Sequence, residues 1–158
     1  MKESPTNLSD IYSFRAVGDR LGTAGQPSEA QFQMIGENGF QAVINLALPT
    51  SDNAIPNEGS VVTSFGMSYI HIPVDFKAPA EQDVQTFCRV MEAFGDRRVF
   101  VHCAANMRVS AFVFLYRVLC QRVAVQEAAR DLHAIWQPDD VWDRFIRDQL
   151  KHHATNEP

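Results

Sequence analysis

Residues 98–110 read RVFVHCAANMRVS, and this stretch decides the fold. Its first five residues are mostly apolar and predict a buried strand, which leads directly into Cys103. Four residues separate Cys103 from Arg108, and a helix is expected from there to about Gln121. Apolar side chains occupy nearly every face of that helix, which is typical of a helix buried on all sides. The stretch therefore predicts a strand, a short loop that carries a cysteine and an arginine, and a buried helix.

Short strands alternate with helices on both sides of this stretch. The strands are expected at 11–17, 20–23, 41–47, 69–73 and 98–102, and the helices at 28–39, 79–95, 109–121, 125–135 and 139–150. The run 61–65 fits either a helical turn or a strand. Strands that alternate with helices indicate right-handed crossovers and a parallel sheet. We therefore expect an α/β fold in which a central, mostly parallel, twisted sheet of four to five strands is flanked by helices.

Local signals mark the ends of two of these helices. Ser28 is a good N-cap, Gln31 completes a capping box, and Gly39 ends the helix. Pro79 fits the first position of the next helix. The apolar stripe of that second helix predicts one buried face, formed by Val84, Phe87, Cys88, Met91 and Phe94.

The composition is that of one soluble domain. The chain has 158 residues and a mass of 17.8 kDa, with 46% hydrophobic and 21% charged residues. We expect a single domain over 1–158, with flexible tails at 1–10 and 152–158. The net charge of −5 and the pI near 5.4 argue against a nucleic-acid-binding or membrane-binding protein. Because no segment approaches the ~20 apolar residues of a membrane span or resembles a secretory signal, we expect a cytoplasmic protein.

The spacing of cysteines and histidines does not indicate a metal site. The three cysteines form no closely spaced pair of the metal-binding or redox type, and the five histidines form no cluster with zinc spacing. Cys88 and Cys120 lie among apolar residues at helical spacing and are expected in the core. We therefore expect reduced thiols and no metal or organic cofactor.

Cys103 and Arg108 are the residues that suit chemistry. A helix N-terminus leaves four N–H groups without intrahelical partners and carries positive dipole charge. A cysteine held there beside a guanidinium is expected to be largely thiolate at neutral pH, because such settings lower a cysteine pKa to ~3.5–7.5. The same N–H groups and Arg108 suit an oxyanion, since a guanidinium contacts two oxygens at once. A thiolate beside a site for a phosphate-shaped anion suits nucleophilic attack on a phosphate ester.

This strand–Cys–loop–Arg–helix unit resembles the signature of cysteine-dependent protein tyrosine and dual-specificity phosphatases. Three segments extend the resemblance, namely TAGQPSEAQF at 23–32, GFQAVINL at 39–46 and YIHIPVD at 69–75. Together they are similar to a small bacterial phosphatase-like family that also occurs fused to beta-lactamase-hydrolase-like proteins. The resemblance covers roughly residues 14–150 and implies a phosphotyrosine-phosphatase-like fold. Two features depart from the wider superfamily: the loop is Cys-x4-Arg rather than Cys-x5-Arg, and it contains no glycine.

The resemblance implies a role for each matching residue. Cys103 is the nucleophile that forms a phosphocysteine, and Arg108 binds the phosphate. Ser110 stands, counted from the cysteine, where a hydroxyl assists the thiolate as leaving group. Asp75 lies in the region that supplies the general acid, and Asp83 is its rival. The other phosphate-binding positions are the loop residues Ala104, Ala105, Asn106 and Met107.

The sequence thus predicts a phosphatase that hydrolyses phosphate monoesters. Its partners are expected to be a phosphorylated protein or small molecule and anions of the phosphate or sulfate type. Two alternatives stay open. The short loop also suits a rhodanese-like sulfurtransferase that carries a persulfide on Cys103, and a catalytically weak pseudo-phosphatase would bind a phosphorylated ligand without turnover. His102 is expected to orient the loop through hydrogen bonds, while Trp136 and Trp142 are expected to pack in the interior.

Overall fold

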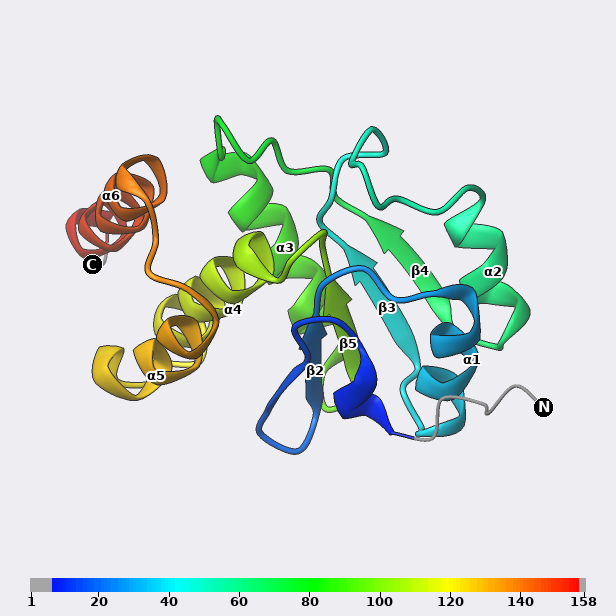
Figure 1. The fold of residues 1–158 in the computed structure, drawn as a ribbon. Coiled ribbons are helices and arrows are strands. Elements are labelled where there is room, and N and C mark those ends of the chain that lie inside the picture. Colours follow the sequence, from blue (N-terminus) through cyan, green and yellow to red (C-terminus); the bar gives the residue numbers. More distant parts are fainter. Residues whose placement is uncertain (1–6, 157–158) are drawn as a thin grey trace.

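The computed structural model describes residues 7–156 and contains a mixed five-stranded sheet (Figure 1). The strands are β1 (Arg15–Val17), β2 (Leu21–Ala24), β3 (Ala42–Asn45), β4 (Ser68–His71) and β5 (Val99–His102). Their order across the sheet is β1-β2-β5-β3-β4, and every neighbouring pair is parallel except β1 with β2. The predicted α/β fold with a mostly parallel sheet is confirmed.

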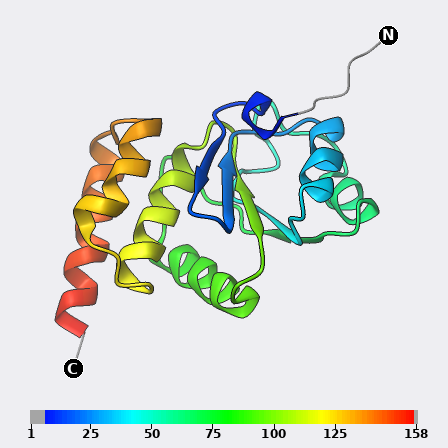
Figure 2. The same ribbon diagram turned by 90° about the horizontal axis from the view of Figure 1, so that it is seen from below.

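Helices cover both faces of the sheet (Figures 1 and 2). One face carries α1 (Glu29–Glu37) and α2 (Glu58–Ser64), and the other carries α3 (Glu81–Phe94), α4 (Met107–Leu119), α5 (Val125–Ile135) and α6 (Asp140–Asn156). Helix α4 contacts β2, α3, α5 and α6, which explains why its sequence is apolar on nearly every side. None of the helices in the described residues is long and apolar enough to cross a membrane.

Side chains of the central strands alternate between two hydrophobic cores, because successive residues of a strand point to opposite faces. In β5, Val99 and Val101 belong to the core that faces α3–α6, while Phe100 belongs to the core that faces α1 and α2. His102 continues this alternation and contacts the Phe32 ring of α1. A strand buried on both faces is apolar over most of its length, and β5 is apolar except for its last residue, His102.

The local signals for α1 and α3 correspond to real contacts. Ser28 Oγ accepts the Gln31 N–H at 3.2 Å, and Gln31 Oε1 accepts the Ser28 N–H at 2.9 Å, so the predicted capping box is present. The predicted stripe of α3 faces inward, with Val84, Phe87 and Met91 buried.

Two predicted boundaries are wrong. The first strand begins at Arg15 rather than at residue 11, because Ser13 has a positive φ of 53° that interrupts the extended backbone. Helix α3 begins at Glu81, so Pro79 is not its first residue. Ala80 between them keeps an extended backbone, with φ −122° and ψ 139°, and acts as the N-cap.

Both predicted tails contain helix. The segment 1–10 includes the short 3-10 helix Leu8–Asp10, and its first six residues lie outside the described part of the chain. At the other end, α6 continues to Asn156, and the last two residues lie outside the described part. His152 Nδ1 of α6 lies 3.3 Å from Glu81 Oε1 of α3, a contact that holds the last turns of α6 against the domain.

Two smaller predictions are resolved by the helix positions. The run 61–65, which fitted either a turn or a strand, lies almost entirely within α2. Cys120 was expected in the core, but it is exposed, because it caps the C-terminal end of α4 where the chain leaves the core.

Candidate active site

The Cys103 loop lies at the carboxyl edge of the parallel strands, which is where ligands bind in sheets of this kind. Cys103 directly follows β5, and its N–H donates to the carbonyl of Ala24 at the end of β2, at 3.3 Å. Asp75 lies just beyond the end of β4. Because β4 and β5 are both parallel to β3, the sheet brings the Cys103 loop and the Asp75 loop to the same edge.

A cavity of about 690 Å³ opens over this edge. Its wall includes Ala104, Ala105 and Arg108 of the cysteine loop, residues 50–53 after β3, residues 75–77 after β4, and the exposed ring of Tyr12. Cys103 itself is only 1% exposed and is not among the described residues that line the cavity. Its sulfur is therefore screened from bulk solvent.

Asn106 makes the sharp turn between β5 and α4. Its φ of 68° and ψ of 2° lie in the left-handed region, where glycine is the usual residue and asparagine is tolerated. The side chain is fully buried, and its Nδ2 donates to the Ser13 carbonyl at 2.9 Å and to the Thr23 hydroxyl at 3.1 Å. These bonds attach the loop to the β1–β2 region, so a loop without glycine still makes the turn.

Hydrogen bonds fix the direction of two peptide groups in the loop. The Cys103 carbonyl oxygen lies 3.2 Å from His102 Nδ1, and the Ala104 carbonyl accepts the Gln26 N–H at 3.2 Å. In a trans peptide the C=O and the following N–H point in opposite directions. The Ala104 N–H therefore points away from His102. The Ala104 carbonyl also accepts Asn53 Nδ2 of the cavity wall at 3.0 Å, so the Ala105 N–H points away from Gln26 and Asn53, and both alanines line the cavity.

Arg108 lies in the first turn of α4 with its guanidinium in the cavity wall. The side chain is 7% exposed, and Nη1 donates to the Val74 carbonyl at 3.0 Å. A guanidinium has five N–H donors, so this bond fixes its position and leaves donors that suit an anion. The N-terminal N–H groups of α4 add to this positive end of the helix.

Of the two candidate acids, Asp75 lines the cavity and Asp83 does not. Asp75 is exposed, and its Oδ1 accepts the Lys77 N–H at 2.9 Å, which holds the carboxyl group at the turn. Asp83 lies in the first turn of α3, where burial raises the pKa of its carboxyl. The geometry favours Asp75 for proton transfer in this cavity.

Two hydrogen bonds hold the hydroxyl of Ser110 at the first turn of α4. It donates to the Met107 carbonyl at 3.0 Å and accepts the indole N–H of Trp136 at 3.1 Å. Ser110 is not one of the cavity-lining residues in the described part of the chain. The structure therefore brings Arg108 and Asp75 to one cavity, while the Ser110 hydroxyl is bonded to the Met107 carbonyl and the Trp136 indole.

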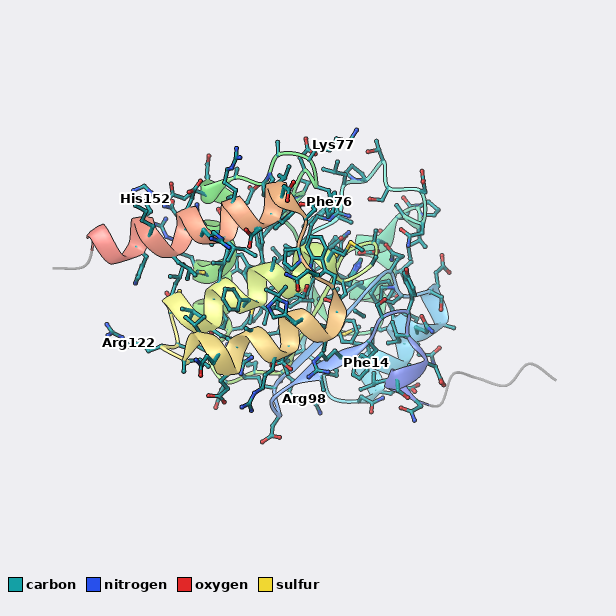
Figure 3. All side chains as sticks on the ribbon, turned by 60° about the vertical axis from the view of Figure 1, so that its left-hand side comes forward. Phe14, Phe76, Lys77, Arg98, Arg122 and His152 are labelled. Atoms are coloured by element: carbon teal, nitrogen blue, oxygen red, sulfur yellow. The ribbon has the colours of Figure 1, made fainter. Side chains whose placement is uncertain are left out.

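Aromatic packing holds the Asp75 loop against the helical layer. Trp142 is fully buried, and its Nε1 donates to the Phe76 carbonyl at 2.8 Å. The Phe76 ring lies 5.8 Å from the rings of both Trp136 and Trp142, and 6.0 Å from the Arg108 guanidinium. In Figure 3, Phe76 lies beside the beginning of α6, while Lys77 points outward. Both tryptophans pack as predicted, and they position the cavity wall.

A buried pair that the sequence did not reveal lies behind the loop. His102 Nε2 lies 2.8 Å from Glu58 Oε2, with side-chain exposures of 0% and 6%. The other oxygen of Glu58 accepts Gln26 Nε2 at 2.7 Å. In the sequence, this pair is indicated by His102 alone, because a histidine in a buried strand needs hydrogen-bond partners. Nothing in the sequence selects Glu58 among the other acidic residues.

The fold and the site together define a class. A parallel α/β sheet with a Cys–loop–Arg–helix unit at its carboxyl edge is the architecture of the protein tyrosine and dual-specificity phosphatases. Residues 15–142 match the sequence model of a family described as DSP-PTPase phosphatase fused to NAD+ kinase, and the chain belongs to this family.

Individual relatives agree with this assignment. The beta-lactamase hydrolase-like protein of Agrobacterium fabrum is 31% identical over 110 residues, which cover 68% of this chain and 25% of that protein. The chain thus spans about a quarter of the length of this curated relative. The predicted relationship to beta-lactamase-hydrolase-like proteins is confirmed.

Solved structures share the fold over nearly the whole chain. A candidate phosphatase (DUF442) from Shewanella putrefaciens CN-32 has a TM-score of 0.83 and 31% identity, covering 92% of this chain and 96% of that one. Tk-PTP in its active form has a TM-score of 0.71 and 20% identity, covering 92% of this chain and 98% of that one. At 20% identity, the likeness to Tk-PTP shows that the two chains share a fold.

Proposed function

We propose that this chain is a cysteine-dependent phosphatase that hydrolyses phosphate monoesters. Membership of the phosphatase family supports the reaction class. The observation that carries the mechanism is that Arg108 and Asp75 share the wall of one cavity, with Cys103 at the base of the same loop. An anion-binding guanidinium, a proton donor and a nucleophile are the three groups that this hydrolysis needs.

In the first step the Cys103 thiolate attacks the phosphorus atom. A sulfur–phosphorus bond forms while the bond from phosphorus to the ester oxygen breaks, and the electron pair stays on that oxygen. Asp75, as the neutral acid, donates its proton to the same oxygen, and the alcohol leaves. Arg108 and the N–H groups of Ala104 and Ala105 bind the phosphoryl oxygens, where they stabilise the charge of the transition state.

In the second step a water molecule hydrolyses the phosphocysteine. Its oxygen bonds to phosphorus, the phosphorus–sulfur bond breaks, and the electron pair returns to the sulfur of Cys103. The Asp75 carboxylate accepts a proton from the water, and inorganic phosphate leaves. Both steps use only side chains and amides of this chain, and no step needs a metal or an organic cofactor.

The substrate class is a phosphorylated protein or small molecule, and free phosphate or sulfate is expected to occupy the same site. The cavity is wide enough for groups larger than the phosphate, and Tyr12 and Phe76 offer aromatic walls. Among proteins of this fold, PTPMT1 was solved in complex with PI(5)P, with a TM-score of 0.73 and 13% identity. That ligand belongs to PTPMT1, and at this identity the likeness concerns the fold.

Loop length favours one other function, a sulfurtransferase that carries a persulfide on Cys103. The two activities are separated by assaying phosphate-ester hydrolysis and thiosulfate sulfurtransfer side by side on the wild type, Cys103→Ser and the control Cys88→Ser. We expect hydrolysis in the wild type and in Cys88→Ser and none in Cys103→Ser. Sulfurtransfer without hydrolysis would replace the proposal, and phosphate binding without either activity would indicate a pseudo-phosphatase.

A further inference from the structure

A buried histidine–glutamate pair supports the Cys103 loop from the face of the sheet opposite α4. His102 is the last residue of β5, and Glu58 is the first residue of α2. The imidazole Nε2 and the carboxylate Oε2 are 2.8 Å apart, and the two side chains are 0% and 6% exposed. Removing two ionisable groups from water in this way is unfavourable unless they are paired. The pair therefore requires an explanation beyond packing.

Both ring nitrogens of His102 face hydrogen-bond acceptors. Nε2 faces the carboxylate of Glu58 at 2.8 Å, and Nδ1 faces the carbonyl oxygen of Cys103 at 3.2 Å. A carbonyl oxygen only accepts, so Nδ1 carries a proton in this arrangement. Whether Nε2 also carries one depends on the state of Glu58, because an ionised carboxylate accepts and a protonated one can donate.

The surroundings of Glu58 favour the ionised carboxylate. Burial raises the pKa of Glu58, but the hydrogen bond and positive charge of His102, with hydrogen bonds from Gln26 and Tyr69, bring it below its ordinary value. Burial, together with the Glu58 charge, raises the pKa of the Tyr69 phenol, so Tyr69 keeps the proton that it donates. With an ionised Glu58 as the acceptor at Nε2 and the Cys103 carbonyl as the acceptor at Nδ1, the geometry corresponds to a ring with protons on both nitrogens.

The imidazole is the end of the pair that contacts the backbone of Cys103. The imidazole ring lies between Glu58 and the backbone of Cys103, so the cation is nearer to Cys103 than the carboxylate is. The elements packed around the ring contribute Phe32 from α1 and, through Glu58, Tyr69 from β4; the described contacts show no second charged group at the ring. The charge of the imidazolium is therefore balanced by Glu58, which lies on the side of the ring away from the Cys103 loop.

We propose that Glu58 is a positioning residue for the nucleophile, which acts by holding His102 as an imidazolium against the carbonyl of Cys103. The inference deepens the proposed function, because it assigns a residue to the activation of the same cysteine. One effect is geometric: the bond to the Cys103 carbonyl fixes this peptide group, so the Ala104 N–H points away from His102, and Ala104 lines the cavity. The other is electrostatic: a cation close to the loop favours the thiolate.

The decisive variant is Glu58→Gln, which keeps the size of the side chain and removes its charge. The rate of Cys103 alkylation by iodoacetamide is followed by mass spectrometry as a function of pH, in the full chain and without substrate. We expect the midpoint of this profile to move to higher pH by about one unit, which gives about tenfold slower alkylation at pH values below the midpoint. Glu29→Gln is the matched control, since it makes the same substitution in the first turn of α1, where the side chain is exposed, and its profile is expected to stay near that of the wild type.

A second measurement uses the wild type alone, so it does not depend on the variant folding. Nitrogen-15 NMR of the His102 ring at neutral pH is expected to show protons on both nitrogens. A ring with one protonated nitrogen, or a folded Glu58→Gln variant with the wild-type alkylation profile, would overturn the inference. Neither readout needs turnover. A wild type that fails to hydrolyse phosphate esters but shows both expected results would therefore contradict only the proposed function.

Discussion

Arg108 Nη1 lies 3.0 Å from the carbonyl oxygen of Val74, the residue directly before Asp75. The arginine in the first turn of α4 is thus bonded to the backbone of the loop that carries the candidate acid. Because this bond joins the two sides of the cavity, the position of the guanidinium and the position of Asp75 are coupled. A substitution of the arginine is expected to affect both anion binding and proton transfer.

Arg108→Lys is expected to weaken tungstate or phosphate binding at least about tenfold, because an ammonium group lacks the planar two-point contact of a guanidinium. Titration calorimetry with tungstate measures the loss. Arg147→Lys is the control, since Arg147 forms an exposed ion pair with Asp143 on α6. Equal binding by both variants would mean that Arg108 serves only to hold the Val74 loop.

Cys103 is expected to react with iodoacetamide below pH 7 faster than Cys88 and Cys120. Access alone would favour Cys120, which is exposed, over Cys103, which is buried. Ionisation acts in the opposite direction, because burial raises the pKa of both Cys88 and Cys120, whereas the proposed mechanism requires a thiolate at Cys103, beside Arg108 and the helix N-terminus. Site-resolved mass spectrometry distinguishes the two effects, and faster labelling of Cys120 would show that access dominates.

Asp75→Asn is expected to slow the hydrolysis of alkyl phosphates much more than that of nitrophenyl phosphate, because nitrophenolate leaves without a proton. The alkaline limb of the pH–rate profile should also flatten, since the acid that loses its proton there is gone. Asp83→Asn serves as the control and is expected to leave both substrates unaffected. If Asp75→Asn slows both substrates equally with an unchanged pH profile, Asp75 is positional and another group supplies the proton.

The strand β5 and the helix α4 could be predicted from the sequence because each is apolar over almost its whole length. An uninterrupted apolar strand and an apolar helix fit only the interior of an α/β domain, so the location of Cys103 between them followed directly. The turn at Asn106 was harder to predict. A left-handed residue is usually signalled by glycine, and asparagine adopts that conformation only in some contexts.

Two features of the site depend on tertiary packing that periodicity does not encode. The bond between Glu58 and His102 joins residues 44 positions apart, and a glutamate in a polar loop has the pattern of a solvated helix start. The position of Ser110 could be counted from the cysteine, but the direction of its hydroxyl could not. That direction depends on Trp136, which lies 26 positions later.

Glu58→Gln is expected to lower stability at neutral pH. The pKa of Glu58 in the folded protein lies below its ordinary value of 4.5, so its ionised form stabilises the fold above that pH, and this contribution is lost as the pH falls further. The variant should therefore be less stable by about 3 kcal/mol at neutral pH, as expected when one partner of a buried pair is removed. Denaturant unfolding of both proteins at pH 7 measures this loss, and equal stability of the two proteins would contradict it. Wild-type stability that does not fall below pH 4.5 would contradict the direction of the shift.

Ser110→Ala distinguishes a structural hydroxyl from a catalytic one. The hydroxyl accepts the indole N–H of Trp136 at 3.1 Å, so its removal leaves a partly buried donor without its acceptor, which costs about 1–2 kcal/mol of unfolding free energy. Trp136→Phe in the same chain removes that donor, and the double variant should therefore lose less than the sum of the two single variants. Phosphocysteine hydrolysis should stay near the wild-type rate, because the hydroxyl is already bonded to the Met107 carbonyl and the Trp136 indole. Rapid-quench kinetics with nitrophenyl phosphate tests this: a burst of nitrophenolate followed by slow turnover in Ser110→Ala, with little change in stability, would give Ser110 the leaving-group role that the family resemblance implies.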